Sequence, residues 1–303
     1  MNNSSELQEY KNIIRLEIEL NNYCNLKCPL CIRNIETDIN LELNNKKLDL
    51  DSLIEKLDKF PNLKYVTIAG PTSEPTLNKN LFEILEYLDN RSIETSLFIN
   101  GNTHDDYYYK KLGFFCRLKK VKIYFTICGS TQELHSKYRI NSDLSTIIKR
   151  ANILNKIIKK KFILTWIIFE YNQKDYIQNK NKFNHFQMEI FYTIPMAEYY
   201  NLPKNGINLP IDQRRIYYSL DKEFNKKSTC KSIKNNFGYM DNDLNLWPCS
   251  IAKLNNFTFD DIQDELRPEC FECFENNLKK LSDNKIHTIS ESEDNISEEN
   301  LWL

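Results

Sequence analysis

The pattern of apolar and polar positions divides the chain into short strand-like runs and longer helical stretches. Six runs of apolar, β-branched and aromatic residues have the length of strands, and they cover residues 13–20, 65–69, 94–99, 121–127, 162–169 and 187–192. The stretches between them repeat apolar residues at helical spacing, most clearly over residues 50–59, 80–88 and 144–158. This alternation predicts βα units that build a parallel sheet, and therefore an α/β fold.

The alternation stops after residue 192, where a connection that contains Pro and Asn runs to residue 210. Beyond it we expect a second, smaller unit with a helix over residues 212–224 and a hairpin over residues 237–247. The last residues, from 282 onwards, are polar and acidic. We therefore predict a core domain over residues 1–210, a small domain over residues 211–281 and an acidic tail over residues 282–303.

Composition and charge favour a globular protein without nucleic-acid or membrane partners. Apolar residues make up 41% of the 303 residues and charged residues 27%, and the formal net charge is −1. A nearly neutral chain offers no broad field that would attract nucleic acid or an anionic membrane. The sequence contains neither a secretory signal nor an apolar run of ~20 residues, so we expect a cytoplasmic protein.

The nine cysteines say more about function than the overall composition does. Since thiols stay reduced in the cytoplasm, clustered cysteines there bind metal or do chemistry rather than form disulfides. Cys24, Cys28 and Cys31 follow the first predicted strand with the spacing CxxxCxxC. Three ligands on a four-iron cluster leave one iron open, as a catalytic site requires, whereas a zinc site would need a fourth, distant ligand. Both kinds of site remain open on the spacing alone.

Polar motifs also follow the next three predicted strands. In parallel sheets and barrels, ligands bind at the carboxyl ends of the strands. The residues of interest at these ends are Gly70, Ser73 and Glu74 after the second strand, Asn100 after the third, and Thr126 and Arg139 around the end of the fourth. Taken singly, each motif is also compatible with an ordinary turn or, for Arg139, with a surface ion pair.

Together with the three-cysteine loop, these motifs resemble the radical S-adenosylmethionine (SAM) superfamily. The resemblance implies a partial (β/α)6 TIM-type barrel in which Cys24, Cys28 and Cys31 hold a [4Fe–4S] cluster. It also implies that the open iron binds the amino and carboxylate groups of SAM. One electron then cleaves SAM to methionine and a 5′-deoxyadenosyl radical, which abstracts a hydrogen atom from the substrate.

The same resemblance gives each motif a role toward SAM. The segment over residues 70–77 is similar to the family's glycine-rich segment, whose backbone groups face the amino group of SAM. Asn100 matches a Thr-Asn-Gly motif, Thr126 matches a serine near the ribose or methionine, and Arg139 matches a guanidinium near the carboxylate. We therefore expect the residues that bind SAM to be Gly70, Ser73, Glu74, Asn100, Thr126 and Arg139.

Several positions depart from the family's pattern. Ser73 stands where a glycine is usual, and Leu30 stands where many members have an aromatic residue beside the adenine. Cys128 replaces the usual aspartate and is either a small packed residue or a hydrogen-atom donor, as the superfamily's epimerases require. We expect Cys116, which has apolar neighbours, to pack in the core and His135 to be structural.

Four further cysteines form a second candidate metal site near the C-terminus. They are Cys230, Cys249, Cys270 and Cys273, and four thiolates suit either structural zinc or a fully ligated iron–sulfur cluster. Behind a radical SAM core, this arrangement resembles the twitch domain, the shorter relative of the SPASM domain, which carries one auxiliary [4Fe–4S] cluster. Leu244 stands where that domain's hairpin usually has glycine, so we expect an altered turn.

An auxiliary cluster with every iron bound by cysteine is suited to electron transfer. We therefore expect the chain to oxidise a polar small molecule, such as a sugar or cyclitol alcohol, and to pass one electron to that cluster. An external one-electron donor such as flavodoxin or ferredoxin would start the reaction. Epimerisation and peptide modification are the alternatives within the superfamily, and a non-catalytic zinc-binding interaction protein is the alternative outside it.

Overall fold

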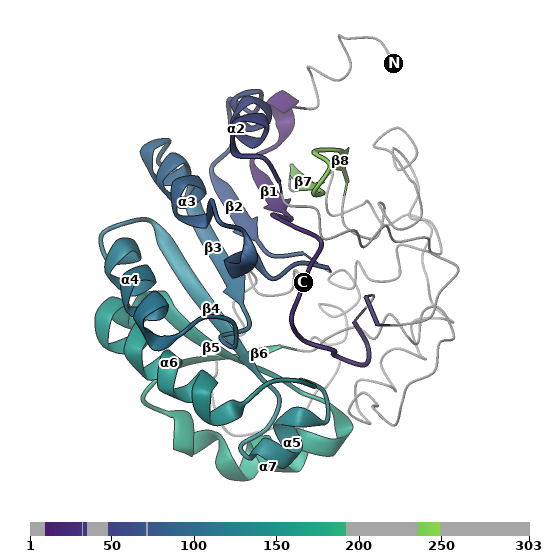
Figure 1. Ribbon diagram of the computed structural model, residues 1–303, viewed down its shortest axis with the longest axis vertical. Helices are drawn as coiled ribbons and strands as arrows, with labels where there is room; N and C mark the ends of the chain where they lie inside the picture. The colour runs from purple at the N-terminus through teal and green to yellow at the C-terminus, as the bar shows by residue number, and fades with distance from the viewer. Residues whose placement is uncertain (1–9, 32, 35–47, 71, 192–235, 249–303) are drawn as a thin grey trace, which may run out of the picture.

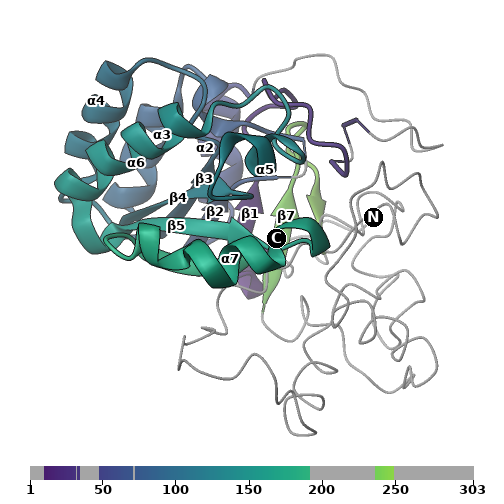
Figure 2. The same ribbon diagram turned by 90° about the horizontal axis from the view of Figure 1, so that it is seen from below.

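The computed structural model describes residues 10–31, 33–34, 48–70, 72–191 and 236–248. These residues form one eight-stranded sheet with the strand order β6-β5-β4-β3-β2-β1-β7-β8 (Figure 1). Neighbouring strands are parallel, except that β8 is antiparallel to β7. Helices cover the outer face of the curved sheet (Figures 1 and 2). The chain is an α/β protein with an incomplete TIM-type barrel, as the alternation of strands and helices predicts.

The six predicted strands of the core are confirmed. The strands are β1 (Arg15–Ile18), β2 (Tyr65–Ile68), β3 (Glu94–Ile99), β4 (Val121–Ile127), β5 (Phe162–Ile167), β6 (Gln187–Phe191), β7 (Phe237–Met240) and β8 (Leu246–Trp247). β3 and β4 have the predicted bounds. β1 is shorter than predicted at both ends, because its hydrogen-bonded ladder stops where the apolar pattern continues into the flanking segments.

The helices begin at polar caps that the sequence supplies. They are α2 (Leu50–Asp58), α3 (Leu81–Asn90), α4 (Asp106–Cys116), α5 (Gln132–Ser136), α6 (Leu144–Ile158) and α7 (Gln173–Asn179), with 3₁₀ segments at Pro75–Leu77, Lys159–Lys161, Glu170–Asn172 and Lys180–Phe183. Asp49, Asp105 and Asp143 cap α2, α4 and α6, since each side chain accepts a hydrogen bond from a backbone N–H of the first turn. The helix predicted over residues 144–158 is α6, and those predicted over 50–59 and 80–88 correspond to α2 and α3.

The alternation of side chains along β1 separates an apolar outer face from a polar concave face. Leu16 and Ile18 are buried in the main core with the helices. Because successive side chains of a strand point to opposite faces, Arg15 and Glu17 lie on the concave side. Neither belongs to the main apolar core. The concave face is therefore lined in part by charged side chains.

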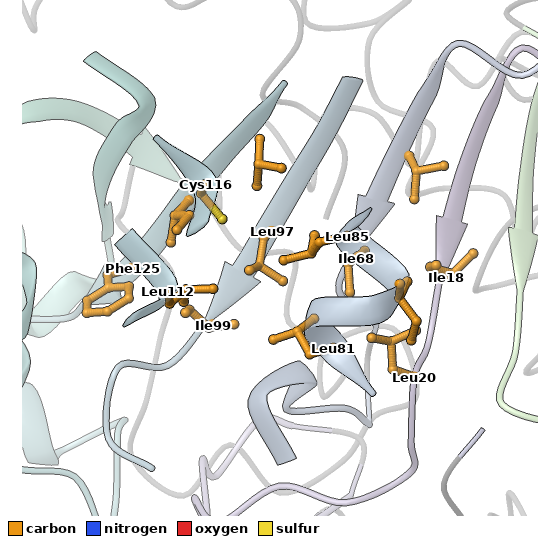
Figure 3. Close-up of a cluster of buried hydrophobic side chains, with 14 of the residues drawn as sticks. Ile18, Leu20, Ile68, Leu81, Leu85, Leu97, Ile99, Leu112, Cys116 and Phe125 are labelled. Atoms are coloured by element: carbon orange, nitrogen blue, oxygen red, sulfur yellow. The ribbon is translucent and has the colours of Figure 1, made fainter. Parts of the chain in front are cut away.

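The main core lies between the sheet and its covering helices (Figure 3). Ile68 of β2 and Leu97 of β3 meet Leu85 of α3 there, and all three side chains are fully buried. Cys116, at the end of α4, lies in the same core, and burial raises the pKa of its thiol to about 12. Its position agrees with the packing role that we expected for it.

The hairpin predicted over residues 237–247 is confirmed, and it extends the sheet of the barrel. β7 pairs in parallel with β1 and places Tyr239 opposite Glu17 (Figures 1 and 2). Leu244 lies in the turn with φ of 64°, a left-handed conformation that costs a non-glycine residue ~1–2 kcal/mol. Its N–H donates to the Asp241 carbonyl at 3.0 Å, and its side chain packs against the main core. The turn thus accommodates leucine through backbone strain that local contacts offset.

The predicted domain boundaries at residues 210 and 281 lie outside the described residues. The small domain that we predicted includes the hairpin, yet β7 belongs to the same sheet as β1. The division into domains therefore stays a prediction. In the part of the chain that the structure describes, the helices are too short or too polar to cross a membrane.

Leu85 tests the packing of α3 on the sheet. Leu85→Ala leaves a cavity beside Ile68 and Leu97, so we expect the free energy of unfolding to fall by ~2–5 kcal/mol. The matched control is Leu118→Ala, because Leu118 is 88% exposed and its truncation should change stability by less than ~0.5 kcal/mol. Chemical denaturation followed by circular dichroism measures both values. Equal effects of the two substitutions would contradict this description of the core.

Candidate active site

The loop after β1 brings the three predicted cluster ligands into a small apolar pocket apart from the main core. Cys28 is buried there with Leu26 and Leu30, while Cys24 and Cys31 are partly buried against them. The ends of β4 and β5 complete the pocket, which also contains Cys128, Tyr138, Ile167 and Phe169. Leu30, where an aromatic residue is common in the resembling family, therefore serves as packing beside the thiols.

The three thiols influence one another through their charges. Burial raises the pKa of Cys24 to about 11 and that of Cys31 to about 12, and in each case the neighbouring Cys28 raises it further. Burial also raises the pKa of Cys28. Thiols in such surroundings stay protonated unless a cation binds to them, because a coordinating metal deprotonates a thiol. The loop therefore holds three closely spaced thiols whose ionisation depends on a positively charged partner.

A single zinc ion and a four-iron cluster require different spacings of the three sulfurs. Zinc holds its sulfur ligands at about 2.3 Å, so the thiols of one zinc site must converge on one point. Among the described residues, no three His, Cys, Asp or Glu side chains converge in this way. A four-iron cluster distributes three cysteines over three different irons and so requires a wider spacing of the sulfurs.

Arg139 lies beside the thiols and is half-buried. Its positive charge lowers the pKa of Cys28 and of Cys128 against the rise that burial causes. Its Nε–H has no hydrogen-bond partner among the described residues. A guanidinium with a buried, unused donor is suited to a carboxylate, which accepts two parallel hydrogen bonds from arginine. This geometry is what the predicted role of Arg139 toward the SAM carboxylate requires.

The loop after β2 is fixed by the buried carboxylate of Glu19. Glu19 Oε1 accepts hydrogen bonds from Thr72 N at 2.9 Å and Thr72 Oγ1 at 2.7 Å. Gly70 has φ of 121°, and a Cβ at this position would lie 2.1 Å from Glu19 Cγ. Ser73, which replaces a glycine of the family's pattern, has no positive φ. The backbone therefore needs glycine at residue 70 and not at residue 73.

Glu74 joins three loops at the carboxyl ends of the strands. Its Oε1 accepts from Thr76 N at 3.2 Å and its Oε2 from Asn100 N at 2.8 Å, which connects the loop after β2 with the end of β3. Its backbone N–H donates to the Tyr23 carbonyl at 2.8 Å, and its carbonyl accepts from Asn21 Nδ2 at 3.0 Å. Both carboxylate oxygens are thus used within the protein, so we infer that Glu74 positions these loops.

Asn100 contacts the cysteine loop directly. Its Nδ2 donates to Asn25 Oδ1 at 2.7 Å and lies 3.8 Å from the sulfur of Cys24. Thr126 is half-buried on the concave face, where it pairs with Thr165 of β5. None of the hydrogen bonds described for this part of the chain joins Thr126 to the thiols. The structure therefore brings Asn100 and Arg139 to the cysteines and leaves Thr126 on the sheet beside them.

Comparison with known families decides which kind of site this is. Residues 18–180, more than half of the 303 residues, match the family described as the Radical SAM superfamily. The chain belongs to the radical SAM superfamily. The matched region contains the three cysteines, the loop at Gly70 and Arg139. No curated protein sequence matches the chain.

Solved structures share the fold of this radical SAM chain at low sequence identity. SuiB of Streptococcus suis bound to precursor peptide SuiA superposes with a TM-score of 0.59 at 15% identity, over 86% of this chain and 64% of SuiB. Native anSMEcpe with bound AdoMet gives a TM-score of 0.56 at 17% identity, over 88% of this chain and 82% of anSMEcpe. The Escherichia coli coproporphyrinogen III oxidase HemN, a radical SAM enzyme, gives a TM-score of 0.50 at 13% identity, over 73% of this chain and 56% of HemN. The chain thus spans less than two thirds of SuiB.

The residues of this radical SAM chain fit the cofactors of the superfamily. Cys24, Cys28 and Cys31 would supply three thiols for the [4Fe–4S] cluster, and the buried, unused Nε–H of Arg139 would suit the carboxylate of SAM. Cys128 is fully buried in the same group of side chains as Cys28. Its closeness to Cys28 was not predictable from its replacement of an aspartate.

His135 has the structural role that we expected. Its Nδ1 accepts from Cys128 N at 3.2 Å and its Nε2 lies 2.7 Å from Ser142 Oγ. Burial lowers the pKa of His135 to about 3, so the ring is neutral at physiological pH. It therefore fixes the turn that carries Arg139 into the site.

Two carboxylates on the concave face of β1 were missed by the sequence analysis. Glu17 is 6% exposed and Glu19 is fully buried. Burial, and then the charge of Glu19, raise the pKa of Glu17 to about 8. The signal was present in the alternating sequence of residues 15–20, where charged residues occupy every position that does not face the helices.

A cavity of about 330 Å³ opens on the same concave face, toward the amino ends of the strands. Charged, hydroxyl and aromatic side chains from six strands line it, among them Arg15, Thr67, Ser96, Phe98, Lys122, Tyr124 and Glu189. The rings of Phe98 and Tyr124 stack with their centroids 4.2 Å apart. The cavity thus offers hydrogen-bonding groups next to an aromatic surface.

The second set of cysteines lies outside the described residues. Cys230, Cys249, Cys270 and Cys273 were predicted to hold an auxiliary cluster, and this ligand set stays a prediction.

Gly70 tests whether the loop after β2 must approach Glu19 so closely. We expect Gly70→Ala to displace the Glu19 carboxylate from Thr72 and to weaken SAM binding by ~10²-fold, because small displacements in a binding site have effects of this size. Equilibrium dialysis of SAM against the iron-loaded protein measures the affinity. Gly113→Ala in α4 is the control, since its Cβ would meet side-chain atoms alone, Ile157 Cδ1 at 3.0 Å and Leu154 Cδ2 at 3.2 Å. Unchanged affinity in Gly70→Ala would refute the role of this contact.

Glu17 is expected to make the folded protein less stable as the pH rises. Because its pKa is 4.5 in the unfolded chain and about 8 in the folded chain, the folded state keeps a proton that the unfolded state releases. The free energy of unfolding therefore falls as the pH rises through this window, by about 2–3 kcal/mol between pH 5 and pH 7. Glu17→Gln removes this contribution, so the variant should gain stability relative to the wild type over the same range. Urea denaturation at several pH values measures it, and parallel pH profiles would show that the carboxyl group titrates normally.

Proposed function

We propose that this radical SAM enzyme oxidises a polar substrate bound on the concave face of its barrel, with a sugar or cyclitol alcohol as the substrate class. The observation that carries the proposal is the position of the three buried thiols at one end of a concave face lined by charged and hydroxyl side chains. When bound, the cluster and SAM supply a 5′-deoxyadenosyl radical that takes a hydrogen atom from the substrate. The chain itself orients the reactants and excludes water from them.

Hydroxyl and charged groups support a polar substrate over an apolar one. Thr67 and Ser96 lie side by side on β2 and β3 and offer hydroxyl groups to the cavity, and Lys122 and Glu189 add charges of both signs. Groups of this kind hold an alcohol by hydrogen bonds, which fix the orientation of a substrate in its pocket. The stacked rings of Phe98 and Tyr124 offer an apolar surface to the C–H face of a sugar or cyclitol.

The oxidation also needs an acceptor for one electron. We propose that Cys230, Cys249, Cys270 and Cys273 hold an auxiliary [4Fe–4S] cluster in a SPASM or twitch-type domain, which receives it. An external donor such as flavodoxin or ferredoxin would deliver the electron that cleaves SAM. A cytoplasmic location follows from these partners.

Peptide modification is the second candidate function. SuiB was solved with its precursor peptide SuiA, and anSMEcpe was solved with peptides as well as with AdoMet. These proteins share the fold with the present chain at 15–17% identity. A serine or cysteine side chain in a peptide is a polar group that the same concave face could bind. Small-molecule oxidation and peptide modification use different substrates, but both begin with the abstraction of a hydrogen atom.

Product mass separates these candidates from redox-neutral chemistry. The iron-loaded enzyme is incubated anaerobically with SAM, a strong reductant and a panel of monosaccharides, cyclitols and Ser- or Cys-containing peptides. Oxidation predicts a SAM-dependent product that has lost two hydrogens, and the class of that compound decides between small molecule and peptide. A product of unchanged mass in H₂O that gains one deuterium when the reaction runs in D₂O would instead show epimerisation.

Iron content tests the assignment of the two cysteine sets. Seven cysteines arranged as three and four predict about eight irons per chain after anaerobic reconstitution. We expect the triple variant Cys24→Ala, Cys28→Ala, Cys31→Ala to keep about four irons and to release no 5′-deoxyadenosine from SAM.

Cys116→Ala is the control for that triple variant, because Cys116 lies in the main core away from the other thiols. It should keep the full iron content and the release of 5′-deoxyadenosine. A wild-type chain that binds zinc in place of iron and leaves SAM intact would favour the non-catalytic alternative.

A further inference from the structure

Glu17 of β1 lies between the cavity and the loops that carry Thr72 and the three cysteines. Along the concave side of β1, Arg15 lines the cavity, Glu17 follows, and Glu19 binds the loop at Thr72. The cysteine loop begins a few residues further on. A substrate that fills the cavity and reaches toward the cofactor end of the barrel must therefore pass the carboxyl group of Glu17.

The neighbours of Glu17 on the sheet form a polar row. Tyr239 of β7 and Thr67 of β2 lie opposite Glu17 in register, and Ser96 of β3 lies opposite Thr67. Paired residues on adjacent strands are about 5 Å apart, so these groups are close enough to contact one small molecule together. The row continues the hydroxyl-rich wall of the cavity up to β1.

Glu17 and Glu19 differ in their partners, although both are buried. Glu19 accepts two hydrogen bonds from Thr72. Within the described part of the chain, neither a hydrogen bond nor an ion pair reaches the Glu17 carboxylate. The cation nearest to it along β1 is Arg15, whose guanidinium lies over the Tyr65 ring at 4.3 Å from its centroid.

A buried carboxyl group without partners is costly to the fold. Burial of an unpaired polar group costs at least as much as a lost hydrogen bond, so such groups occur where a ligand or a reaction uses them. Burial also shifts the group toward neutrality, and its pKa of about 8 lies close to physiological pH. A general base works best when its pKa is near the pH of the reaction.

We propose that Glu17 is the catalytic base of this enzyme, accepting a hydrogen bond and then the proton of the substrate hydroxyl on the carbon that loses its hydrogen. This assignment rests on the oxidation proposed above. The C–H hydrogen leaves as an atom to the deoxyadenosyl radical, and the O–H proton moves to a carboxylate oxygen of Glu17. The C–O single bond becomes C=O as the remaining electron leaves, and the auxiliary iron–sulfur cluster proposed above would be its acceptor. The substrate thus loses two hydrogens, and Glu17 later returns its proton to water.

Glu17→Gln tests the proposal in the reconstituted full-length enzyme. The probe is the panel compound from which the wild type removes two hydrogens. We expect Glu17→Gln to slow formation of that product by ~10²–10⁴-fold, the usual contribution of a general base. Glu17→Asp keeps a carboxyl group and should retain more activity than Glu17→Gln. Release of 5′-deoxyadenosine in the absence of substrate should stay within about twofold of wild type in each variant, because it does not use the base.

Glu83→Gln is the matched control for the chemical change. Glu83 is an exposed residue of α3 on the outer side of the sheet, so the same substitution there should change neither reaction. Iron content and circular dichroism show that each variant is folded and loaded.

The pH dependence provides a readout that a merely structural role would not move. The titratable groups on the same side of β1 and of its neighbouring strands are Arg15, Tyr65 and Tyr239, with Glu19 and Asp241 just beyond the strand ends. Of these, the charge of Glu19 raises the pKa of Glu17. The pKa of Tyr239 is raised by burial well above its ordinary value, so this phenol stays neutral over the range tested. Product formation should rise with pH through about 8 in the wild type and become flat in Glu17→Gln. Infrared spectra of the enzyme without substrate should show a protonated-carboxyl band that fades through the same pH range and is missing from Glu17→Gln.

Each outcome of these experiments decides something. If the wild type forms no product with two fewer hydrogens from any panel compound but still cleaves SAM, the proposed oxidation fails and the base fails with it. If the wild type forms such a product and Glu17→Gln forms it equally fast at every pH, the oxidation stands and the assignment of Glu17 is wrong. Loss of product together with loss of the infrared band, while SAM cleavage is kept, supports Glu17 as the base.

Discussion

The two-residue alternation of β1 is the constraint on which the rest of the structure depends. It places Leu16 and Ile18 among the helices and Glu17 and Glu19 on the concave face. A shift of one residue would exchange the two sets and bury charged groups in the main core, which makes the register of this strand strongly specified. Because the strand is pinned in this way, the loop that follows it delivers Cys24, Cys28 and Cys31 to a fixed position.

Buried carboxylates then hold the loops around that position. Glu19 binds the backbone and hydroxyl of Thr72, and Glu74 binds the backbone of Asn100. Both carboxylates accept hydrogen bonds from N–H and O–H donors, and these bonds compensate for their burial. Among the described residues, no hydrogen bond or ion pair compensates the burial of Glu17 on the same face. This contrast separates carboxylates that build the site from the one that is available to a substrate.

Much of the fold and the cysteine site could be predicted from the sequence. Local periodicity was sufficient for the strands and for α6, because that signal lies within a few residues. The spacing of three cysteines singled out the loop in which the structure gathers the thiols, and their role as cluster ligands stays a prediction. The pairing of β1 with β7 joins residues 15–18 to residues 237–240, and no local pattern reveals it.

The hydrogen-bond partners of individual side chains could not be predicted from the sequence either. The resemblance assigned the backbone around Glu74 to SAM and did not reveal that its carboxylate oxygens accept hydrogen bonds from Thr76 and Asn100. Glu17 was missed because motif reasoning concentrates on the carboxyl ends of strands, whereas this residue lies within the strand. Leu244 shows a third limit, because a strained backbone accepted a residue that its usual chemistry disfavours.

The central claim is that Cys24, Cys28 and Cys31 hold a four-iron cluster whose open iron binds SAM beside Arg139. The most direct measurement is electron–nuclear double resonance of the reduced, iron-loaded enzyme with SAM labelled by ¹⁷O in its carboxylate and ¹⁵N in its amino group. We expect hyperfine coupling of both labels to the cluster, and we expect the carboxylate coupling to change in Arg139→Lys. A fully loaded cluster that shows no coupling to either label would contradict it.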